Sequence, residues 1–214
     1  IIILQGYGLT ETSPIITVNS FKERKYGSVG KPLPGIELKI LKEDGTEGKE
    51  GEIVTKGPHI MNGYYCNPEK TQEVLKDGWL HTGDIGKLDK DGFLYITGRL
   101  RNLIVLGGGK KVFPEELEDV MSKSPYIKEI CVLAKIADKG IDKGCEEVFA
   151  IVVPNLDNVD KDKRMDKEFI KSTIGSELNQ LGKNLAEYKR IKDFYVSYDD
   201  LPKTSTQKIK RKEV

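Results

Sequence analysis

Four short segments carry the residue types that could do chemistry. The first, "QGYGLTETSP" (residues 5–14), places two glycines around Tyr7 and continues to Thr10 and Glu11. Glycine lets the backbone approach a ligand closely, and the tyrosine ring offers a flat face to another ring. The Thr10 hydroxyl can donate to a phosphate oxygen, and the Glu11 carboxylate can bind a hard cation such as Mg²⁺. The alternative is a glycine-rich turn followed by a helix cap. The G-x-G spacing also lacks the third glycine of a dinucleotide-binding fingerprint.

The next segments supply a carboxylate and an arginine. In "GWLHTGDIG", Asp84 follows a small Thr82-Gly83 pair. An ionised carboxylate can accept two hydrogen bonds, which suits a ribose diol, although a turn aspartate is the alternative. His81 is interpreted as structural, because no partner base or set of metal ligands is visible. Arg99, in "ITGRLRN", could donate to a sugar or a phosphate.

The stretch "NLIVLGGGKKVF" superficially suggests a phosphate-binding loop. The Walker pattern fails, because Lys111 stands where Ser or Thr is required after Lys110. A hairpin fits better, with its turn at Gly107–Gly109, since glycine accepts positive φ.

The last segment is "LPKTSTQKIKR" near the C-terminus. Its proline, threonines and serine suit an extended loop that delivers Lys208 to a reacting anion. A nuclear-localisation or nucleic-acid-binding tail is a second interpretation, and a solvated basic end is the third.

Composition limits the class of protein. The 214 residues have a net charge of +1 and 32% charged residues, above the usual ~25%, which indicates a well-solvated surface without a global attraction to nucleic acid. Uninterrupted apolar runs are far shorter than the ~20 residues of a membrane span. The three cysteines lack CxxC spacing, which predicts free thiols in a reducing, cytoplasmic setting, and two histidines make a zinc site improbable. The initial Ile suggests a piece of a longer chain.

Hydrophobic periodicity predicts the elements that position these residues. We expect mostly antiparallel strands in the first half and α+β structure in the second, which makes the fold class α+β. In the first half we expect a buried strand at 1–4, strands at 35–41 and 52–57, a helix from 67 that stops at Gly78, and a hairpin over 84–98. In the second we expect a hairpin at 102–113, a helix from Pro114, apolar runs at 127–136 and 147–154, a helix within 166–187 and a strand at 191–198.

Together, the four segments resemble the motifs of acyl-adenylate-forming enzymes, the AMP-dependent synthetases and ligases. Residues 7–11 resemble the family's Tyr-Gly-x-Thr-Glu motif, and residues 82–84 resemble its Thr-Gly-Asp motif. Gly98-Arg99 with the glycine hairpin resembles the hinge motif, and residues 202–209 resemble the terminal Pro-Lys-Thr-x-x-Gly-Lys-Ile motif. "GGGKKVFPEELE" is most similar to bacterial acyl-CoA synthetases of the long-chain type.

The sequence departs from this pattern in three places. Gln207 replaces the glycine before the terminal lysine, and Arg101 stands where the hinge usually has Lys or Asp. The Ser/Thr/Gly-rich loop that clamps the ATP phosphates is absent from these residues, so we expect it upstream of Ile1.

The resemblance implies two domains. Residues 1–98 would end a large N-terminal adenylation domain, including its distorted β-barrel. Residues 99–214 would form a small, mobile α+β lid with a hinge at about 99–102.

The implied reaction joins a carboxylic acid, expected to be a fatty acid, to ATP to give an acyl-adenylate and pyrophosphate. Coenzyme A then gives acyl-CoA and AMP, with Mg²⁺ as cofactor. Lys208, Thr10 and Glu11 would be catalytic. The implied roles are adenine stacking by Tyr7 beside Gly8, α-phosphate contact by Thr10, Mg²⁺ ligation by Glu11, ribose binding by Asp84 and Arg99, charge stabilisation by Lys208, a CoA thiol path past Gly108 and Gly109, and a hinge at Arg101.

Alternatives remain open at this stage. Within the family, the acyl acceptor could be a carrier protein instead of coenzyme A. The 214 residues could also be a non-catalytic module, and we expect them to be inactive alone. A nucleic-acid-binding role is disfavoured by the near-neutral charge and the lack of aromatic-interleaved basic patches.

Overall fold

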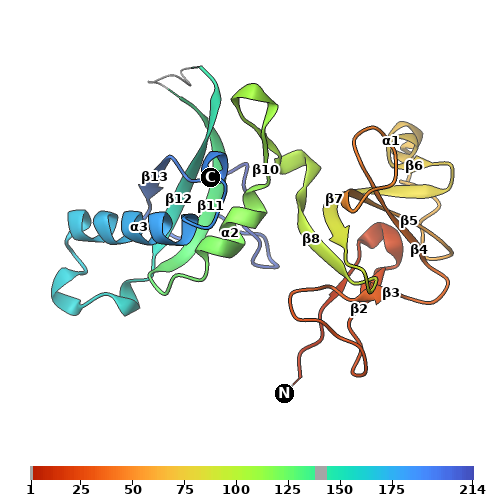
Figure 1. Ribbon diagram of the computed structural model, residues 1–214, viewed down its shortest axis with the longest axis horizontal. Helices are drawn as coiled ribbons and strands as arrows, with labels where there is room; N and C mark the ends of the chain where they lie inside the picture. Colours follow the sequence, from red (N-terminus) through yellow and green to blue (C-terminus); the bar gives the residue numbers. More distant parts are fainter. Residues whose placement is uncertain (1, 138–143) are drawn as a thin grey trace. The chain divides into compact units, whose positions relative to one another are not determined.

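A computed structural model describes residues 2–137 and 144–214, and the chain divides into two compact units between Arg101 and Asn102 (Figure 1). Within these ranges, each unit has its own sheets and its own buried apolar residues, with one cluster in the first unit and two in the second. The described residues combine α-helices with mostly antiparallel strands, which confirms the α+β fold class.

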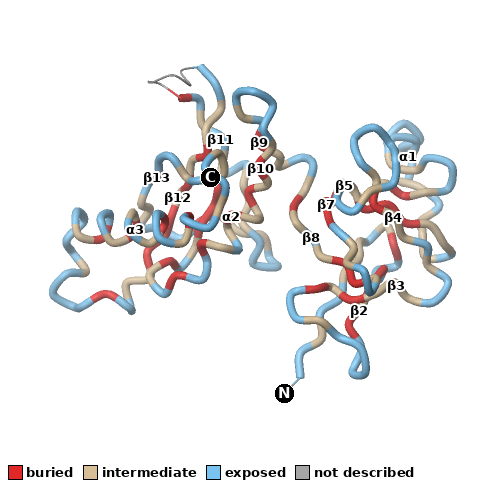
Figure 2. Tube along the Cα trace, in the orientation of Figure 1, coloured by how far each residue is buried: buried red, intermediate tan, exposed pale blue. Residues whose placement is uncertain are grey.

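A five-stranded antiparallel sheet dominates the first unit. Its longest strand, β7 (Trp79–Leu88), pairs with β5 (Glu50–Lys56) along one side. On the other side, β6 (Leu75–Lys76) covers the start of β7 and β8 (Leu94–Arg99) covers its end, while β4 (Glu37–Leu41) extends the sheet beyond β5. Buried residues follow β5 and β7 (Figure 2). The predicted strands at 35–41 and 52–57 and the predicted hairpin over 84–98 are confirmed.

The sheet is open, whereas the resemblance implied a distorted barrel. Closure would require an outer strand such as β8 to pair with β4. Instead, Leu94 of β8 exchanges backbone hydrogen bonds with Val29 and Gly30, at 2.9 Å each. An irregular segment therefore occupies this edge, and strand pairing among the described residues does not close.

A smaller sheet in the same unit joins β1 (Gly6–Tyr7), β2 (Thr17–Val18) and β3 (Lys31–Pro32). The predicted buried strand at 1–4 is wrong in its described part, since Ile2 and Ile3 are 58% and 85% exposed and pairing begins at Gly6. Ile1 lies outside the described residues. An apolar run is buried only where another surface covers it, and no described segment covers this one.

Helix α1 (Pro68–Val74) begins at Asn67, whose side chain accepts from the Lys70 backbone N–H at 3.0 Å. The helix was expected to continue to Gly78 but ends four residues earlier. Asp77 and Gly78 both take positive φ, 52° and 78°, which is the backbone of a tight hairpin turn. This turn folds Leu75–Lys76 back onto β7 as β6.

The second unit is a three-stranded sheet packed against two helices. Strands β11 (Ile127–Ile136) and β12 (Glu146–Pro154) are antiparallel, and β13 (Asp193–Val196) pairs with β12 in parallel. The core joins these strands to α2 (Pro114–Met121) and α3 (Lys167–Gly182). The predicted hairpin is confirmed as β9 (Ile104–Val105) and β10 (Lys111–Val112). The chain also has 3-10 helices at Thr10–Thr12, Leu100–Asn102, Gly107–Gly109, Leu156–Asn158, Lys161–Lys163 and Glu187–Lys189.

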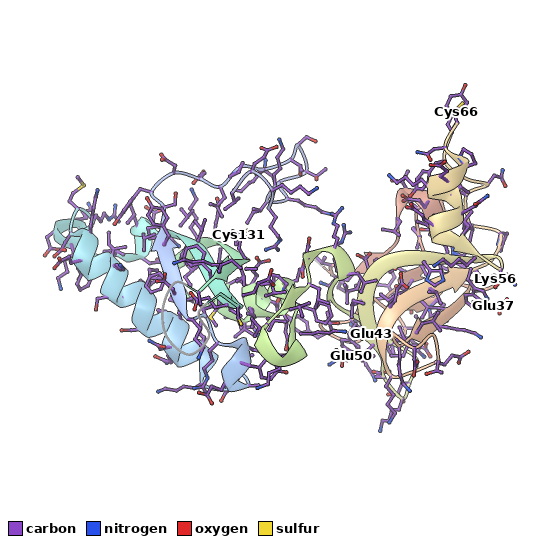
Figure 3. The ribbon with its side chains drawn as sticks, turned by 90° about the horizontal axis from the view of Figure 1, so that it is seen from above. Glu37, Glu43, Glu50, Lys56, Cys66 and Cys131 are labelled. Atoms are coloured by element: carbon purple, nitrogen blue, oxygen red, sulfur yellow. The ribbon has the colours of Figure 1, made fainter. Side chains whose placement is uncertain are left out.

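The three cysteines are free, as the sequence predicts. Cys66 stands beside α1 at the surface, and Cys131 lies on β11 (Figure 3). Burial raises the pKa of the Cys131 thiol to about 11, so this cysteine stays protonated and unreactive at neutral pH.

Gly30 gives a test of its close approach to strand β2 in the smaller sheet. Its φ is +90°, and an added Cβ would lie 1.9 Å from the Val18 carbonyl carbon. We expect Gly30→Ala to lower the free energy of unfolding by more than ~2 kcal/mol. The control Gly45→Ala, with φ +79° and open space around it, should cost about 1 kcal/mol. Urea unfolding followed by the fluorescence of Trp79, the single tryptophan, measures both, and equal losses would contradict this packing.

Candidate active site

Asp84 is placed by a bulge in β7. Glu52 pairs with Ile85 and Val54 pairs with His81, so Ile53 alone faces the three residues 82–84. The Thr82 hydroxyl donates to the Ile53 carbonyl oxygen at 2.7 Å, which fixes the bulge to β5.

The Glu52 carboxylate also holds the bulge, through contacts with His81 and Gly83. Its Oε1 accepts from the Gly83 backbone N–H at 3.0 Å, and its Oε2 lies 2.8 Å from His81 Nδ1. Gly83 has φ +70°, a conformation that favours glycine. His81 therefore has a structural partner. Glu52 was missed in the sequence, because no local signal links residues 29 positions apart.

Three of the predicted residues meet at Asp84, whose side chain is only 2% exposed. Oδ2 accepts a hydrogen bond from the Tyr7 hydroxyl at 2.8 Å, and Oδ1 lies 2.7 Å from Arg99 Nε in an ion pair. Arg99 is opposite Asp84 in the β7–β8 register, so the hairpin itself brings the two charges together. An ionised carboxylate has about four lone-pair positions, more than these two partners use.

Tyr7 joins the small sheet to this carboxylate. Its ring packs against the apolar cluster of Ile40, Ile53 and Leu94. Burial, and then the negative charge of Asp84, raises the pKa of Tyr7 far above its ordinary value. The phenol therefore stays protonated and keeps its donor on Asp84 at physiological pH.

Gly8 and Glu11 follow in the next turn of chain. A Cβ on Gly8 would lie 1.8 Å from the Pro14 carbonyl oxygen, so only glycine fits this close approach. The 3-10 helix Thr10–Thr12 then presents the exposed Thr10. Glu11 Oε1 accepts from the Tyr64 hydroxyl at 2.8 Å, a partner that the sequence did not reveal.

The Glu11 side chain fits a role as one of several ligands to Mg²⁺. Tyr64 fixes one carboxylate oxygen, while Oε2 has no hydrogen-bond partner among the described residues. Those residues contain no group of three or more His, Cys, Asp or Glu side chains placed to hold a metal. Mg²⁺ is often held by one or two carboxylates together with the phosphates of a substrate, and this donor set suits that arrangement.

In the second unit, Lys208 sits on a small hairpin. Lys203 and Ile209 form an isolated β-bridge, and Thr204 N–H donates to the Lys208 carbonyl oxygen at 2.8 Å. Gln207, where the family pattern has glycine, takes φ +63°. The Lys208 side chain is exposed and forms no ion pair within the described residues.

The remaining predicted residues are exposed on short turns. Gly108 and Gly109 have φ +76° and +75° in the turn between β9 and β10, which confirms the glycine hairpin. Arg101 lies in the 3-10 helix Leu100–Asn102, where the two units divide.

Comparison with known proteins identifies the family. The model of the AMP-binding enzyme family matches residues 1–65, and the model of the AMP-binding enzyme C-terminal domain matches residues 116–208. The chain belongs to the AMP-binding enzyme family. A long-chain-fatty-acid–CoA ligase of Escherichia coli is 36% identical over 99% of this chain, and an indoleacetate–CoA ligase of Aromatoleum aromaticum is 34% identical over 99%.

Solved structures of AMP-binding enzymes agree with this assignment. The o-succinylbenzoate–CoA synthetase of Bacillus subtilis in complex with AMP is 32% identical, with a TM-score of 0.78 over 99% of this chain and 40% of that one. The same synthetase in complex with ATP and a magnesium ion has a TM-score of 0.77 at 32% identity, over 98% of this chain and 40% of that one. The chain spans 35% of the length of the Escherichia coli ligase and 39% of the indoleacetate ligase. None of the helices among the described residues is long and apolar enough to span a membrane.

The Tyr7–Asp84 hydrogen bond should make stability depend on pH. Because the folded pKa of Tyr7 is raised, its contribution is fully present below the unfolded pKa of about 10 and is lost as pH rises above it. At pH 8, Tyr7→Phe should lower the free energy of unfolding by ~1.5–3 kcal/mol, since Asp84 loses a donor. The difference from the unmutated chain should shrink between pH 10 and pH 11.5.

Urea unfolding monitored by Trp79 fluorescence at several pH values measures this difference. Tyr65→Phe is the control, because Tyr65 is fully exposed and its removal should change stability by less than ~0.5 kcal/mol at pH 8. A Tyr7→Phe deficit that stays constant from pH 8 to pH 11.5 would refute the proposed pairing.

Proposed function

We propose that this chain is the C-terminal part of an ATP-dependent acid–CoA ligase that acts on a fatty acid. The observation that carries the proposal is the buried Asp84 carboxylate, which accepts from the Tyr7 hydroxyl and pairs with Arg99. Support comes from relatives named as acid–CoA ligases and from the similar synthetase bound to AMP.

The first unit would bind the nucleotide. Asp84 accepts the ribose hydroxyls, Arg99 holds that carboxylate in place, and the Tyr7 ring lies beside the adenine. Gly8 has no side chain, so the backbone there can come close to the nucleotide. The exposed Thr10 hydroxyl donates to the α-phosphate. Glu11 would hold Mg²⁺, which, when bound, neutralises charge on the departing pyrophosphate.

Lys208 would supply a positive charge where the carboxylate of the acid attacks the α-phosphate. Preorganised donors aimed at developing negative charge are commonly the largest source of catalysis. The Lys208 ammonium can pair with a substrate anion, since no described residue neutralises its charge. The exposed turn with Gly108 and Gly109 would leave room for the pantetheine arm of coenzyme A in the second step.

We also propose that residues 1–98 end the adenylation domain and that 99–214 form a lid that pivots at Arg101. In this scheme the lid brings Lys208 for adenylation and then the glycine hairpin for thioester formation. The missing phosphate-binding loop would lie in the rest of the protein, so residues 1–214 alone would be inactive. ATP and coenzyme A as substrates favour a cytoplasmic enzyme.

The proposal is tested by product formation. Full-length protein incubated with ATP, Mg²⁺, coenzyme A and acids of graded chain length should yield acyl-CoA, detected by mass spectrometry. Formation of acyl-adenylate without acyl-CoA would instead favour a carrier-protein acceptor. No acyl-adenylate with any acid would overturn the proposal.

Lys208→Ala should slow adenylation by about 10²–10³-fold, since one preorganised charge is lost. Thioester formation from preformed acyl-adenylate should change far less, because Lys208 has no role in that step. Single-turnover kinetics of each half-reaction in the full-length protein measure both rates. Lys210→Ala is the control, because Lys210 is already paired with Glu213 at 3.0 Å. Equal losses in the two half-reactions would contradict the role given to Lys208.

Arg101→Pro tests the hinge. Proline fixes φ near −65° and removes a backbone donor, so the pivot should be held in one orientation. Adenylation and thioester formation should then fall by factors that differ at least about tenfold. The same two single-turnover assays measure this, and a uniform decrease would show that the chain does not pivot at Arg101.

A further inference from the structure

Arg211, three residues after Lys208, is a cation with several partners at the C-terminal end of the second unit. Its Nη1 and Nη2 donate to Oε1 and Oε2 of Glu118 at 2.7 and 2.8 Å. The two side chains are 22% and 19% exposed. Two parallel charge-assisted hydrogen bonds in this fork geometry fix direction as well as distance.

Glu118 ties Arg211 to the sheet. Its Oε1 also accepts from the Val132 backbone N–H at 2.6 Å, and Arg211 donates to the Val132 carbonyl oxygen. The guanidinium thus joins helix α2, strand β11 and the segment that follows Lys208. An arginine on a merely solvated basic tail would make none of these contacts.

A second carboxylate holds the chain on the other side of the hairpin. Glu129 of β11 is 8% exposed and binds Lys203 Nζ at 2.5 Å. Its other oxygen accepts from the Leu201 backbone N–H at 3.1 Å. Lys208 therefore lies between two anchored points, Lys203 before it and Arg211 after it.

The base of the hairpin is apolar and packed. Leu201 is buried with Cys131 and Val153, and Ile209 packs against this cluster. The ends of the hairpin are thus fixed to β11 and β12, while Lys208, directly after the turn and before Ile209, remains exposed.

The same network reaches the first residue of the unit. Glu115, one helical turn before Glu118 on α2, accepts from the Asn102 side-chain amide through Oε1. That oxygen also lies 3.7 Å from Arg211 Nη2. Hydrogen bonds and ion pairs therefore connect Asn102, directly after Arg101, to Arg211.

We propose that Arg211 is a positioning residue that sets the direction of the Lys208 ammonium relative to the start of the second unit. This inference rests on the role proposed for Lys208. A lysine side chain has four rotatable bonds, so its charge is preorganised only if its backbone is fixed. With Arg211 docked, a rotation at the hinge delivers Lys208 as part of one rigid body. Without it, the arm of the hairpin that follows Lys208 loses its charged anchor and keeps only the bridge and the packing of Ile209.

The test compares Arg211→Met with Lys189→Met in the full-length protein. Lys189 pairs with Glu116 on the same helix at 2.6 Å and is also 22% exposed, so it matches Arg211 in burial and partner type. It lies outside the Lys208 hairpin. Glu118→Gln is a second variant that keeps a neutral hydrogen-bonding group on α2, in case Arg211→Met does not fold.

The measurements are hydrogen exchange over residues 203–210 and single-turnover rates of both half-reactions. Arg211→Met should speed exchange in the hairpin at least about tenfold. It should lower the adenylation rate at saturating ATP about tenfold, because small misplacements of a reacting charge are costly. The apparent affinity for ATP and the rate of thioester formation should stay within about twofold. Arg211→Lys should recover part of the adenylation rate, since a lysine cannot form the two parallel bonds.

A merely structural role gives another pattern. In that case Arg211→Met would lower both half-reactions together, in proportion to the loss of thermal stability, as Lys189→Met would. That result, or unchanged exchange over 203–210, overturns the inference and leaves the proposed function standing. A wild-type protein that forms no acyl-adenylate overturns the proposed function and this inference with it.

Discussion

The first unit is organised around the burial of one carboxylate. Asp84 is removed from water almost completely, and an ionised carboxylate without partners in such a place costs several kcal/mol. Arg99 supplies the opposite charge and Tyr7 supplies a donor, so both oxygens are partly satisfied. The bulge that carries Asp84 requires in turn the positive φ of Gly83 and the Glu52 clamp.

The hydrogen bond between Tyr7 and Asp84 also sets the position of strand β1 and the turn that follows it. Because Tyr7 belongs to β1, its bond to Asp84 ties the small sheet to the large one. The Tyr7 carbonyl oxygen accepts from Ile16 N–H at 2.8 Å, so the turn with Thr10 and Glu11 is closed by the same residue. The side chains that we assign to ribose, phosphate and metal are therefore held by one hydrogen-bonded unit. The second unit uses carboxylates in the same way, with Glu118 and Glu129 holding the hairpin of Lys208.

Local signals predicted much of this structure. Alternating apolar residues predicted β4, and apolar runs with turn residues between them predicted β5 and the β7–β8 hairpin. In the structure this hairpin places Arg99 opposite Asp84. The glycine turn at 107–109 was also correct. The early end of α1 could have been found, since Asp77-Gly78 is a strong hairpin signal that was overlooked.

Other features had no local signal. Glu52, Tyr64 and Glu118 are ordinary surface residue types in the sequence, and their partners are 31, 53 and 93 positions away. Only the fold brings them together. Ile2 and Ile3 are exposed although the sequence predicted a buried strand. An apolar run shows that burial would be favourable, but it does not show which other segment covers it. The open sheet likewise depends on pairing between Leu94 and the irregular segment at Val29 and Gly30.

The central claim is that Asp84 recognises the ribose of a nucleotide, and equilibrium binding tests it most directly. Calorimetry would compare AMP with 2′,3′-dideoxy-AMP on the full-length protein and on its Asp84→Asn variant. The account predicts that the wild-type protein prefers AMP about 100-fold, the effect of losing hydrogen bonds to a charged acceptor. In Asp84→Asn the preference should fall below about tenfold. Equal affinity of the wild-type protein for the two nucleotides would contradict the claim.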